Sequence, residues 1–296
     1  LAGWTALQFA QSDALVFVGA VGIAVRAIAP HCCSKASDPA VVVLDECGRF
    51  AVPVLSGHLG GANDLARALA AVCGAVPVIT TATDAHGIFA VDEWAKHQNC
   101  TVLEAERIKH VSSKLLAGQS VRFAAEFSVQ GTPPAGVDPA RTPAEADFAL
   151  TLSPAGDALH LVPRIGVLGI GCRRGTCAEQ LEAAFTDFCA RHSLAPACIA
   201  AAASIDLKAD EAGLLAFCRA HGWPITFYSA EQLRALPGPF TPSPFVQSVT
   251  GVDNVCERAA VLASGGCIRI PKQAGGGVTF ALALCPYAPD WRWQNG

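Results

Sequence analysis

Residues 40–64 read AVVVLDECGRFAVPVLSGHLGGAND, and this stretch decides the fold class. The apolar run Ala40–Leu44 is typical of a buried strand. A turn at Gly48 leads into Phe50–Leu55, which we expect to be the return strand. A glycine-rich turn follows, and apolar residues at helical spacing then predict a helix over Asn63–Cys73. Strand, turn and helix in this order indicate an α/β layer fold.

The same alternation extends outward from this stretch in both directions. Strands are predicted at Ala14–Val18 and Val76–Thr80, and a second α/β unit begins with a strand at Ile165–Ile170. We therefore expect two α/β domains with mainly parallel or mixed sheets, joined by a segment rich in proline and glycine. The expected bounds are residues 1–127 for the N-terminal domain with a central module, 128–160 for a linker or variable segment, and 161–296 for the C-terminal domain.

The composition excludes several classes of protein. A chain of 296 residues is long enough for two domains, and 52% hydrophobic against 16% charged residues excludes a disordered chain. A net charge of −4 offers no basic surface for nucleic acid. Thirteen cysteines are too sparse for a secreted disulfide scaffold, and the longest uncharged apolar stretch, residues 14–25, is too short to span a bilayer. We expect a cytoplasmic protein with no nucleic-acid or membrane partner.

Methionine is absent, and the first residue is Leu1. Average composition would place about six methionines in a chain of this length. We therefore expect that the sequence lacks an initial segment and that internal methionine positions are missing from it.

The strongest local signal is the glycine-rich turn between the return strand and the helix. Three glycines allow the backbone to come close to a ligand, and free N–H groups at a helix start attract anions. Asn63 or Asp64 as a helix cap in a tight structural turn is the other interpretation. The candidate binding residues in this turn are Ser56, Gly57, His58, Gly60, Gly61 and Asn63.

A second polar loop, Thr80-Thr-Ala-Thr-Asp84, also follows a predicted strand. If the sheet is parallel here, its Thr80, Thr81 and Asp84 face the same edge as the first loop. A cluster of helix-capping residues explains the loop equally well. Arg26 lies in an apolar stretch, where its charge needs a partner, and either an anionic ligand or a carboxylate such as Asp38 would supply one.

The second unit carries its own candidates. Gly169-Ile-Gly-Cys-Arg-Arg-Gly175 resembles a dinucleotide turn, but its third glycine comes one residue late, so Arg173 and Arg174 fit carboxylate binding better. Lys208 lies among carboxylates, where it could be a proton donor but a structural ion pair is favoured, and it is also a candidate substrate-binding residue. Lys272 precedes a run of glycines.

Several catalytic and metal motifs are absent from the sequence. It contains no G-x-S-x-G elbow, no Walker loop, no C-x-x-C and no H-E-x-x-H. His31, Cys32 and Cys33 could form a soft metal site, but adjacent cysteines are poor ligands for zinc, which favours ordinary thiols.

Two ordered sets of motifs resemble the cobalt-precorrin-5A hydrolases of anaerobic vitamin B12 biosynthesis. The first set comprises Val21–Pro30, Lys35, Asp38–Glu46, Leu55–Asn63 and Pro77–Asp84, and the second comprises Gly169–Gly175, Ser204–Glu211, Gly251–Glu257 and Gly277–Thr279. Together they cover nearly the whole chain, with the proline-rich middle as the variable part. Family members have an additional N-terminal strand and helix that is not found before Leu1.

The resemblance implies a substrate and a reaction. The substrate is a cobalt-bound, ring-contracted tetrapyrrole whose δ-lactone is opened by water, so that acetaldehyde leaves and cobalt-precorrin-5B remains. Because no nucleophile motif is present, we expect direct attack by water. His58 is the candidate general base, Asp84 would orient it, and backbone N–H groups near Gly60 and Gly61 would hold the oxyanion.

Such a substrate carries many carboxylates around an apolar ring, so isolated basic side chains should hold its periphery. We expect Arg26, Lys35, Arg173 and Lys272 in this role. The cobalt belongs to the substrate, and neither a cofactor nor a protein-bound metal is expected. Handover to other cobalamin-pathway enzymes and a homodimer are further expectations.

Two other functions remain open at this stage. A non-catalytic carrier or chaperone of corrinoid intermediates would bind the substrate and release no acetaldehyde, and the C-terminal unit alone resembles small proteins of the pathway. A nucleotide-dependent enzyme would use the turn at Gly169, and a thermal shift with nicotinamide or flavin nucleotides would reveal it.

Overall fold

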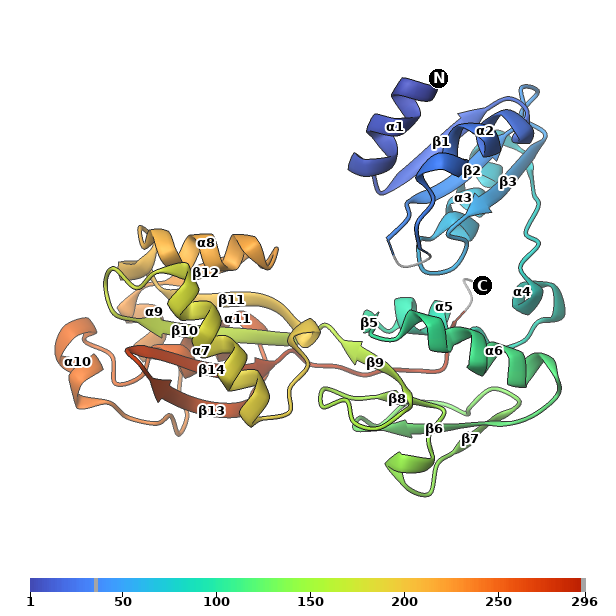
Figure 1. The fold of residues 1–296 in the computed structure, drawn as a ribbon. Helices are drawn as coiled ribbons and strands as arrows, with labels where there is room; N and C mark the ends of the chain where they lie inside the picture. The colour runs from blue at the N-terminus through green and yellow to red at the C-terminus, as the bar shows by residue number, and fades with distance from the viewer. Residues whose placement is uncertain (35–36, 294–296) are drawn as a thin grey trace.

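The computed structural model describes residues 1–34 and 37–293. It contains three sheets, each in its own lobe, with the N-terminal lobe next to the central one and the C-terminal lobe to the side (Figure 1). The α/β class and the two α/β domains expected from the sequence are confirmed. Lys35 lies outside the described residues.

The N-terminal domain is a four-stranded sheet of order β1-β2-β3-β4 between two helical layers. Strand β2 is buried on both faces: Val41 and Val43 pack toward α2, and Ala40 and Val42 pack toward α3, which explains its continuous apolar run. Pairing is parallel for β1 with β2 and β3 with β4, and antiparallel for β2 with β3. The elements are α1 (Ala2–Gln11), β1 (Ala14–Val18), α2 (Val21–Ile28), β2 (Ala40–Leu44), β3 (Phe50–Leu55), α3 (Ala62–Cys73) and β4 (Val76–Pro77).

The central lobe corrects the expectation of a linker over residues 128–160. This segment supplies β7, β8 and the first two residues of β9 to a five-stranded sheet of order β5-β9-β8-β6-β7. Most of its prolines and its glycines lie between the strands, and β7 is an edge strand that tolerates Pro139. Strands of three residues are too short to show the alternation that identifies a strand in sequence. The elements are α4 (Ala82–His86), α5 (Val91–His97), β5 (Cys100–Val102), α6 (Ile108–Leu116), β6 (Val121–Ala125), β7 (Val137–Pro139), β8 (Phe148–Leu150) and β9 (Leu159–Pro163).

The C-terminal domain is a mixed sheet of order β12-β11-β10-β14-β13. Helices α7 and α8 cover one face with Phe185, Phe188 and Phe217, and α9 and α11 cover the other. The elements are β10 (Gly166–Cys172), α7 (Ala178–Arg191), β11 (Ile199–Ile205), α8 (Ala212–Ala220), β12 (Ile225–Tyr228), α9 (Ala230–Ala235), α10 (Pro244–Thr250), α11 (Cys256–Ser264), β13 (Cys267–Gly275) and β14 (Val278–Leu284).

After β14 the chain returns to the central lobe. Trp291 stacks on Trp94 of α5 with ring centroids 5.0 Å apart, and the Trp94 indole donates a hydrogen bond to the Asp290 carbonyl oxygen at 2.6 Å. Gln98 and Tyr287 add further contacts, because the Tyr287 hydroxyl donates to the Gln98 carbonyl at 3.0 Å. The C-terminal segment therefore holds α5 against the central core.

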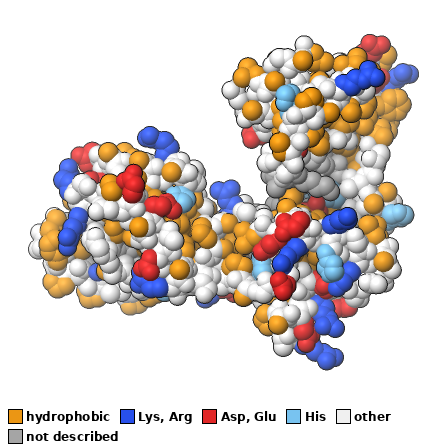
Figure 2. All heavy atoms as spheres, in the orientation of Figure 1, with side chains coloured by type: hydrophobic (Ala, Val, Ile, Leu, Met, Phe, Trp, Pro, Cys, Tyr) orange, Lys and Arg blue, Asp and Glu red, His pale blue; other side chains and the backbone are white. Residues whose placement is uncertain are grey.

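Two surface properties bear on the expected partners. On the face shown in Figure 2, side chains of Lys and Arg are interspersed with those of Asp and Glu rather than gathered into one basic patch. Among the described residues, no helix combines the length and the apolar character that crossing a membrane requires.

Candidate functional site

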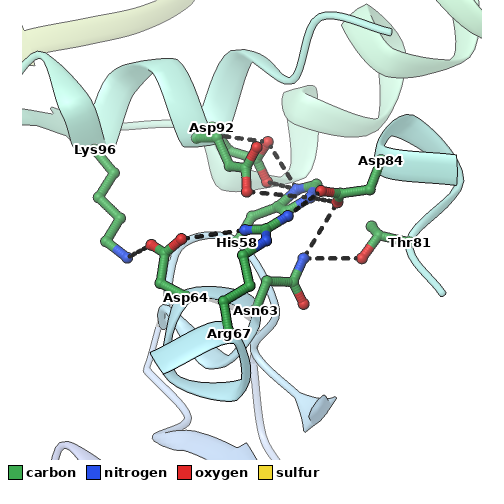
Figure 3. A network of polar contacts seen from close by, with 9 residues as sticks. His58, Asn63, Asp64, Arg67, Thr81, Asp84, Asp92 and Lys96 are labelled. Carbon is green, nitrogen blue, oxygen red and sulfur yellow. Dashed lines mark hydrogen bonds and ion pairs between the residues drawn. The ribbon is translucent and has the colours of Figure 1, made fainter. Parts of the chain in front are cut away.

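The two polar loops of the N-terminal half meet at one edge of the sheet. Strands β3 and β4 are parallel, so the turn after β3 and the loop after β4 emerge side by side. The Asn63 amide donates hydrogen bonds to Thr81 Oγ1 at 3.1 Å and to Asp84 Oδ2 at 3.2 Å. Helix α5 of the central lobe faces this edge and brings Asp92 to it (Figure 3), and Glu93 follows on the same helix within 3.9 Å of His58 Nε2.

His58 lies at the centre of this cluster between carboxylates. Its Nδ1 is 3.1 Å from both carboxylate oxygens of Asp92, and its Nε2 is 2.8 Å from Asp84 Oδ2. Burial alone would lower the pKa of His58, but the hydrogen bond and charge of Asp92, with Asp84 next, raise that pKa to about 9. His58 is therefore an imidazolium at neutral pH, and both of its nitrogens act as donors.

This geometry does not fit the expectation that His58 is a general base. A base needs a nitrogen lone pair directed at the proton it removes. Both nitrogens of His58 face carboxylates within hydrogen-bond distance, so neither presents a lone pair to a substrate. The ring is instead a buried proton donor, and Asp84 contacts it directly.

Glu93 is the carboxylate in this cluster that can still accept a hydrogen bond or a proton. Its Oε1 is 3.9 Å from His58 Nε2, and its Oε2 is buried without a hydrogen-bond partner among the described residues. Burial raises the pKa of Glu93 to about 7, although the positive charge of His58 opposes this rise. A carboxylate in this state can accept or release a proton close to neutral pH.

Two basic side chains pair with the carboxylates of this cluster. Arg67 of α3 donates to Asp84 Oδ1 at 2.8 Å and to Asp64 at 3.2 Å, and Lys96 of α5 contacts Asp64 Oδ2 at 2.7 Å. The Lys96–Asp64 pair and the His58–Asp92 pair both join the N-terminal domain to α5. The site is thus built across the junction of two lobes.

The glycines of the turn are required by close packing rather than by a visible ligand. A Cβ at Gly57 would lie 2.8 Å from Asn63 Oδ1, and one at Gly60 would lie 2.4 Å from the Cβ of Ser56. The Gly61 amide donates to the His58 carbonyl at 2.9 Å, so it is already used within the turn and is not free to hold an oxyanion. This corrects the expectation for Gly61.

Family models match both ends of the chain. The cobalamin synthesis G N-terminal model matches residues 3–84, and the cobalamin synthesis G C-terminus model matches residues 166–283. A cobalt-precorrin-5A hydrolase of Priestia megaterium is 32% identical over 94% of this chain and 80% of that protein. A cobalt-precorrin-5A hydrolase of Salmonella typhimurium is 36% identical over 93% of this chain and 83% of that protein.

The chain belongs to the cobalt-precorrin-5A hydrolase family. It is a hydrolase of cobalamin biosynthesis, as the resemblance of its motifs implied. Protein CobE of a Sinorhizobium species is 34% identical over 120 residues, which are 40% of this chain and 78% of that protein.

In this hydrolase the remaining loop candidates have structural contacts. The Ser56 hydroxyl donates to the Asp38 carbonyl at 3.0 Å, and Ser56 adopts a left-handed backbone with φ of 54°. Thr81 accepts from Asn63, whereas Thr80 is exposed. Arg26 is exposed on α2 and forms no ion pair within the described residues, so the expected carboxylate partner Asp38 does not reach it.

The basic residues of the C-terminal domain lie in a different lobe from His58. Arg173 and Lys208 follow the parallel strands β10 and β11, so they share one edge of that sheet. Lys208 pairs with Glu211 at 3.0 Å, and Arg174 lies 3.4 Å from Asp210. Lys272 lies in β13, half-buried.

The turn at Gly169 is explained without a nucleotide. Gly169 and Gly171 lie inside strand β10, not in a loop before a helix. A Cβ at Gly169 would lie 1.8 Å from the backbone oxygen of Cys256, and one at Gly171 would lie 2.5 Å from Thr279 Oγ1. Close contact with α11 therefore requires Gly169, and the Thr279 side chain on β14 requires Gly171, which removes the basis for a dinucleotide fold at this position.

Sequence reasoning missed four functional groups: Asp92, Glu93, Arg67 and Lys96. Asp92 and Glu93 are adjacent carboxylates between Val91 and Trp94 in the first turn of a short helix, and both are buried. Buried carboxylates are costly unless they are paired or serve a purpose, so two adjacent carboxylates between apolar residues were the available signal.

Proposed function

We propose that this hydrolase opens the δ-lactone of cobalt-precorrin-5A with water and releases acetaldehyde, leaving cobalt-precorrin-5B. Relatives at 32% and 36% identity over most of the chain are named cobalt-precorrin-5A hydrolases, which supports this substrate. Within the site, the observation that carries the proposal is a buried histidine held by two carboxylates, beside a third carboxylate whose Oε2 has no hydrogen-bond partner among the described residues. Cobalt enters as part of the substrate.

Opening a lactone with water needs one group that accepts a proton and one that donates a proton. Water adds to the lactone carbonyl carbon while one of its protons moves to a base, and the C–O bond of the ring then breaks as the leaving oxygen gains a proton. Acetaldehyde leaves in a second step: the C–C bond between the freed hydroxyethyl group and the macrocycle breaks, the hydroxyl loses its proton and the macrocycle carbon gains one. Glu93 is the base in this proposal, because its Oε2 has no other partner in the described chain. His58 is the donor: when the lactone enters, its Nε2 proton passes to the leaving oxygen in place of Asp84, while Asp92 holds the ring through Nδ1.

Substrate access requires movement between lobes. The side chains of His58, Asp84 and Glu93 are each less than a tenth exposed, so a tetrapyrrole cannot reach them in the arrangement of Figure 3. The Lys96–Asp64 and His58–Asp92 pairs span the junction and must loosen for the lactone to enter. The Lys96–Asp64 pair, with side chains 39% and 30% exposed, has the modest strength that breaking and re-forming at each turnover requires.

The carboxylates around the macrocycle require cations outside this buried cluster. Arg26 and Arg173 are the most available, because both are exposed and neither forms an ion pair within the described residues. Lys272 is half-buried and is likewise without an ion pair there, and Lys35 remains a candidate from the sequence alone. Arg174 and Lys208 are engaged by Asp210 and Glu211, so they contribute less.

The test is acetaldehyde release from the purified chain supplied with cobalt-precorrin-5A. We expect release from the unmodified protein and a loss of at least about 100-fold in kcat for His58→Gln and for Glu93→Gln, the usual effect of removing general acid–base catalysis. His221→Gln is the matched control, because His221 also pairs with a carboxylate, Glu182 at 2.7 Å, but in the C-terminal domain.

The outcomes separate the alternatives. Full turnover by Glu93→Gln would refute the assignment of the base, and full turnover by His58→Gln would refute the assignment of the donor. If the unmodified chain binds the tetrapyrrole and releases no acetaldehyde, it acts as a carrier or chaperone of corrinoid intermediates and the proposal fails.

A further inference from the structure

We infer that His58, Asp84 and Glu93 form a binding site for a divalent first-row metal cation. One ligand atom from each residue lies within 4.8 Å of the ligand atoms of the other two. The three residues come from the turn after β3, from α4 and from α5, so folding rather than sequence proximity assembles them. All three side chains are at least nine-tenths buried.

A second, independent observation points to a ligand that is positively charged. Glu93 is 5% exposed, and its Oε2 has no hydrogen-bond partner in the described chain, while its Oε1 faces His58 Nε2. Buried carboxylate oxygens are rarely left without a partner, because the desolvation is not compensated. A cation between the three side chains would supply the missing partner.

The distances between the three ligand atoms lie on either side of the ligand–ligand distance in a metal site. Four ligands at about 2.05 Å from a tetrahedral metal lie about 3.3 Å from one another. His58 Nε2 is 2.8 Å from Asp84 Oδ2 and 3.9 Å from Glu93 Oε1, so one pair must open and the other must close by about 0.5 Å. Changes of this size need only side-chain rotation.

The surroundings orient the ligands as they do around metal ions in proteins. Asp92 accepts from His58 Nδ1 with both carboxylate oxygens at 3.1 Å, which directs Nε2 toward Asp84 and Glu93. A carboxylate behind a histidine ligand is the usual arrangement around protein-bound transition metals. Arg67 donates a hydrogen bond to Asp84 Oδ1 at 2.8 Å, so Oδ2 is the oxygen that is directed into the cluster.

The donor set indicates which cations the site would take. One imidazole and two carboxylates suit Mn²⁺, Fe²⁺ or Zn²⁺, whereas Mg²⁺ is bound through oxygen ligands. Binding of the cation would displace the Nε2 proton of His58, so in the proposed reaction the cation, and not His58, would act on the leaving oxygen and would lower the pKa of a bound water. The binding itself does not rest on that reaction, because it can be measured without substrate.

Titration of the chelator-treated full chain with Mn²⁺ tests the inference, with free Mn²⁺ followed by electron paramagnetic resonance. Mn²⁺ is chosen because it binds thiolates poorly, which suppresses background from the thirteen free cysteines. We expect one equivalent bound by the unmodified protein and a loss of at least 100-fold in affinity in Glu93→Gln. Asp92→Asn should weaken binding by 10–100-fold, a graded effect that misfolding would not produce.

His221→Gln is again the matched control and should bind like the unmodified chain, and circular dichroism checks that each variant is folded. Absence of Mn²⁺ binding, or binding that Glu93→Gln and Asp92→Asn leave unchanged, would overturn the inference. A chain that releases acetaldehyde without binding Mn²⁺ refutes the cation site alone. A chain that binds Mn²⁺ and releases no acetaldehyde refutes the proposed reaction alone.

Discussion

Replacing Trp291 with alanine tests whether the C-terminal segment holds the central lobe together. Trp291 is 8% exposed, stacks on Trp94 at 5.0 Å and meets the edge of Phe123 at 4.8 Å. Removing a buried tryptophan destabilises a protein by about 3–5 kcal/mol, from lost burial, the cavity and the aromatic pairs. We expect a loss of about 4 kcal/mol, confined to the central lobe.

Urea denaturation followed by tryptophan fluorescence measures this loss. Trp94 and Trp293 remain in the central lobe as reporters in the variant. Trp4→Ala is the matched control, because Trp4 is 47% exposed on α1 and its removal should change stability by about 1 kcal/mol or less. Since Trp94 belongs to α5, acetaldehyde release should fall in Trp291→Ala as well.

A loss below about 1 kcal/mol in Trp291→Ala would refute the reasoning. It would mean that the C-terminal segment rests on the lobe without stabilising it. Equal losses of unfolding free energy in Trp291→Ala and Trp4→Ala would likewise show that burial in this aromatic cluster does not add stability.

Other changes test packing and charge elsewhere in the chain. Gly169→Ala should destabilise by about 3 kcal/mol or more, because its Cβ would overlap a backbone oxygen of α11, whereas Gly22→Ala meets open space and should be neutral in thermal denaturation. Burial opposes ionisation of Asp147, but Lys114 at 2.6 Å outweighs it and lowers the Asp147 pKa. The contribution of Asp147 to the free energy of unfolding is therefore complete above about pH 4 and is lost as the pH falls through that lowered pKa. In urea titrations, the free energy of unfolding of Asp147→Asn should fall less steeply with acid than that of the unmodified chain. Ser229→Ala removes a helix cap of α9 and should lower stability by about 1 kcal/mol.

The outer domains were predictable from sequence because their elements are long and regular. Ala40–Leu44 and Phe50–Leu55 have the same bounds in the structure as in the prediction. The central lobe was missed because β7 and β8 are three residues long and lie among prolines. For such strands, pairing with distant segments outweighs local propensity, and a single sequence does not reveal that pairing.

The site was half predictable for a related reason. His58, Asn63, Thr81 and Asp84 converge because β3 and β4 are parallel, which the alternation of elements indicated. Asp92 and Glu93 arrive from α5, whose position depends on how two lobes dock. No local pattern encodes that docking, so the partners of His58 from the second lobe could not be assigned.

Placing the site at this junction has a physical consequence. His58 and Asp84 lie within the stretch matched by the N-terminal family model, residues 3–84, whereas Asp92 and Glu93 lie beyond it. The imidazolium and its free carboxylate therefore meet only when α5 is docked, and α5 is held by Trp291 from the far end of the chain. Loosening the C-terminal segment should separate donor from base without touching either residue. Loss of turnover in Trp291→Ala with unchanged far-ultraviolet circular dichroism would demonstrate this dependence, and full turnover would show that the site forms without it.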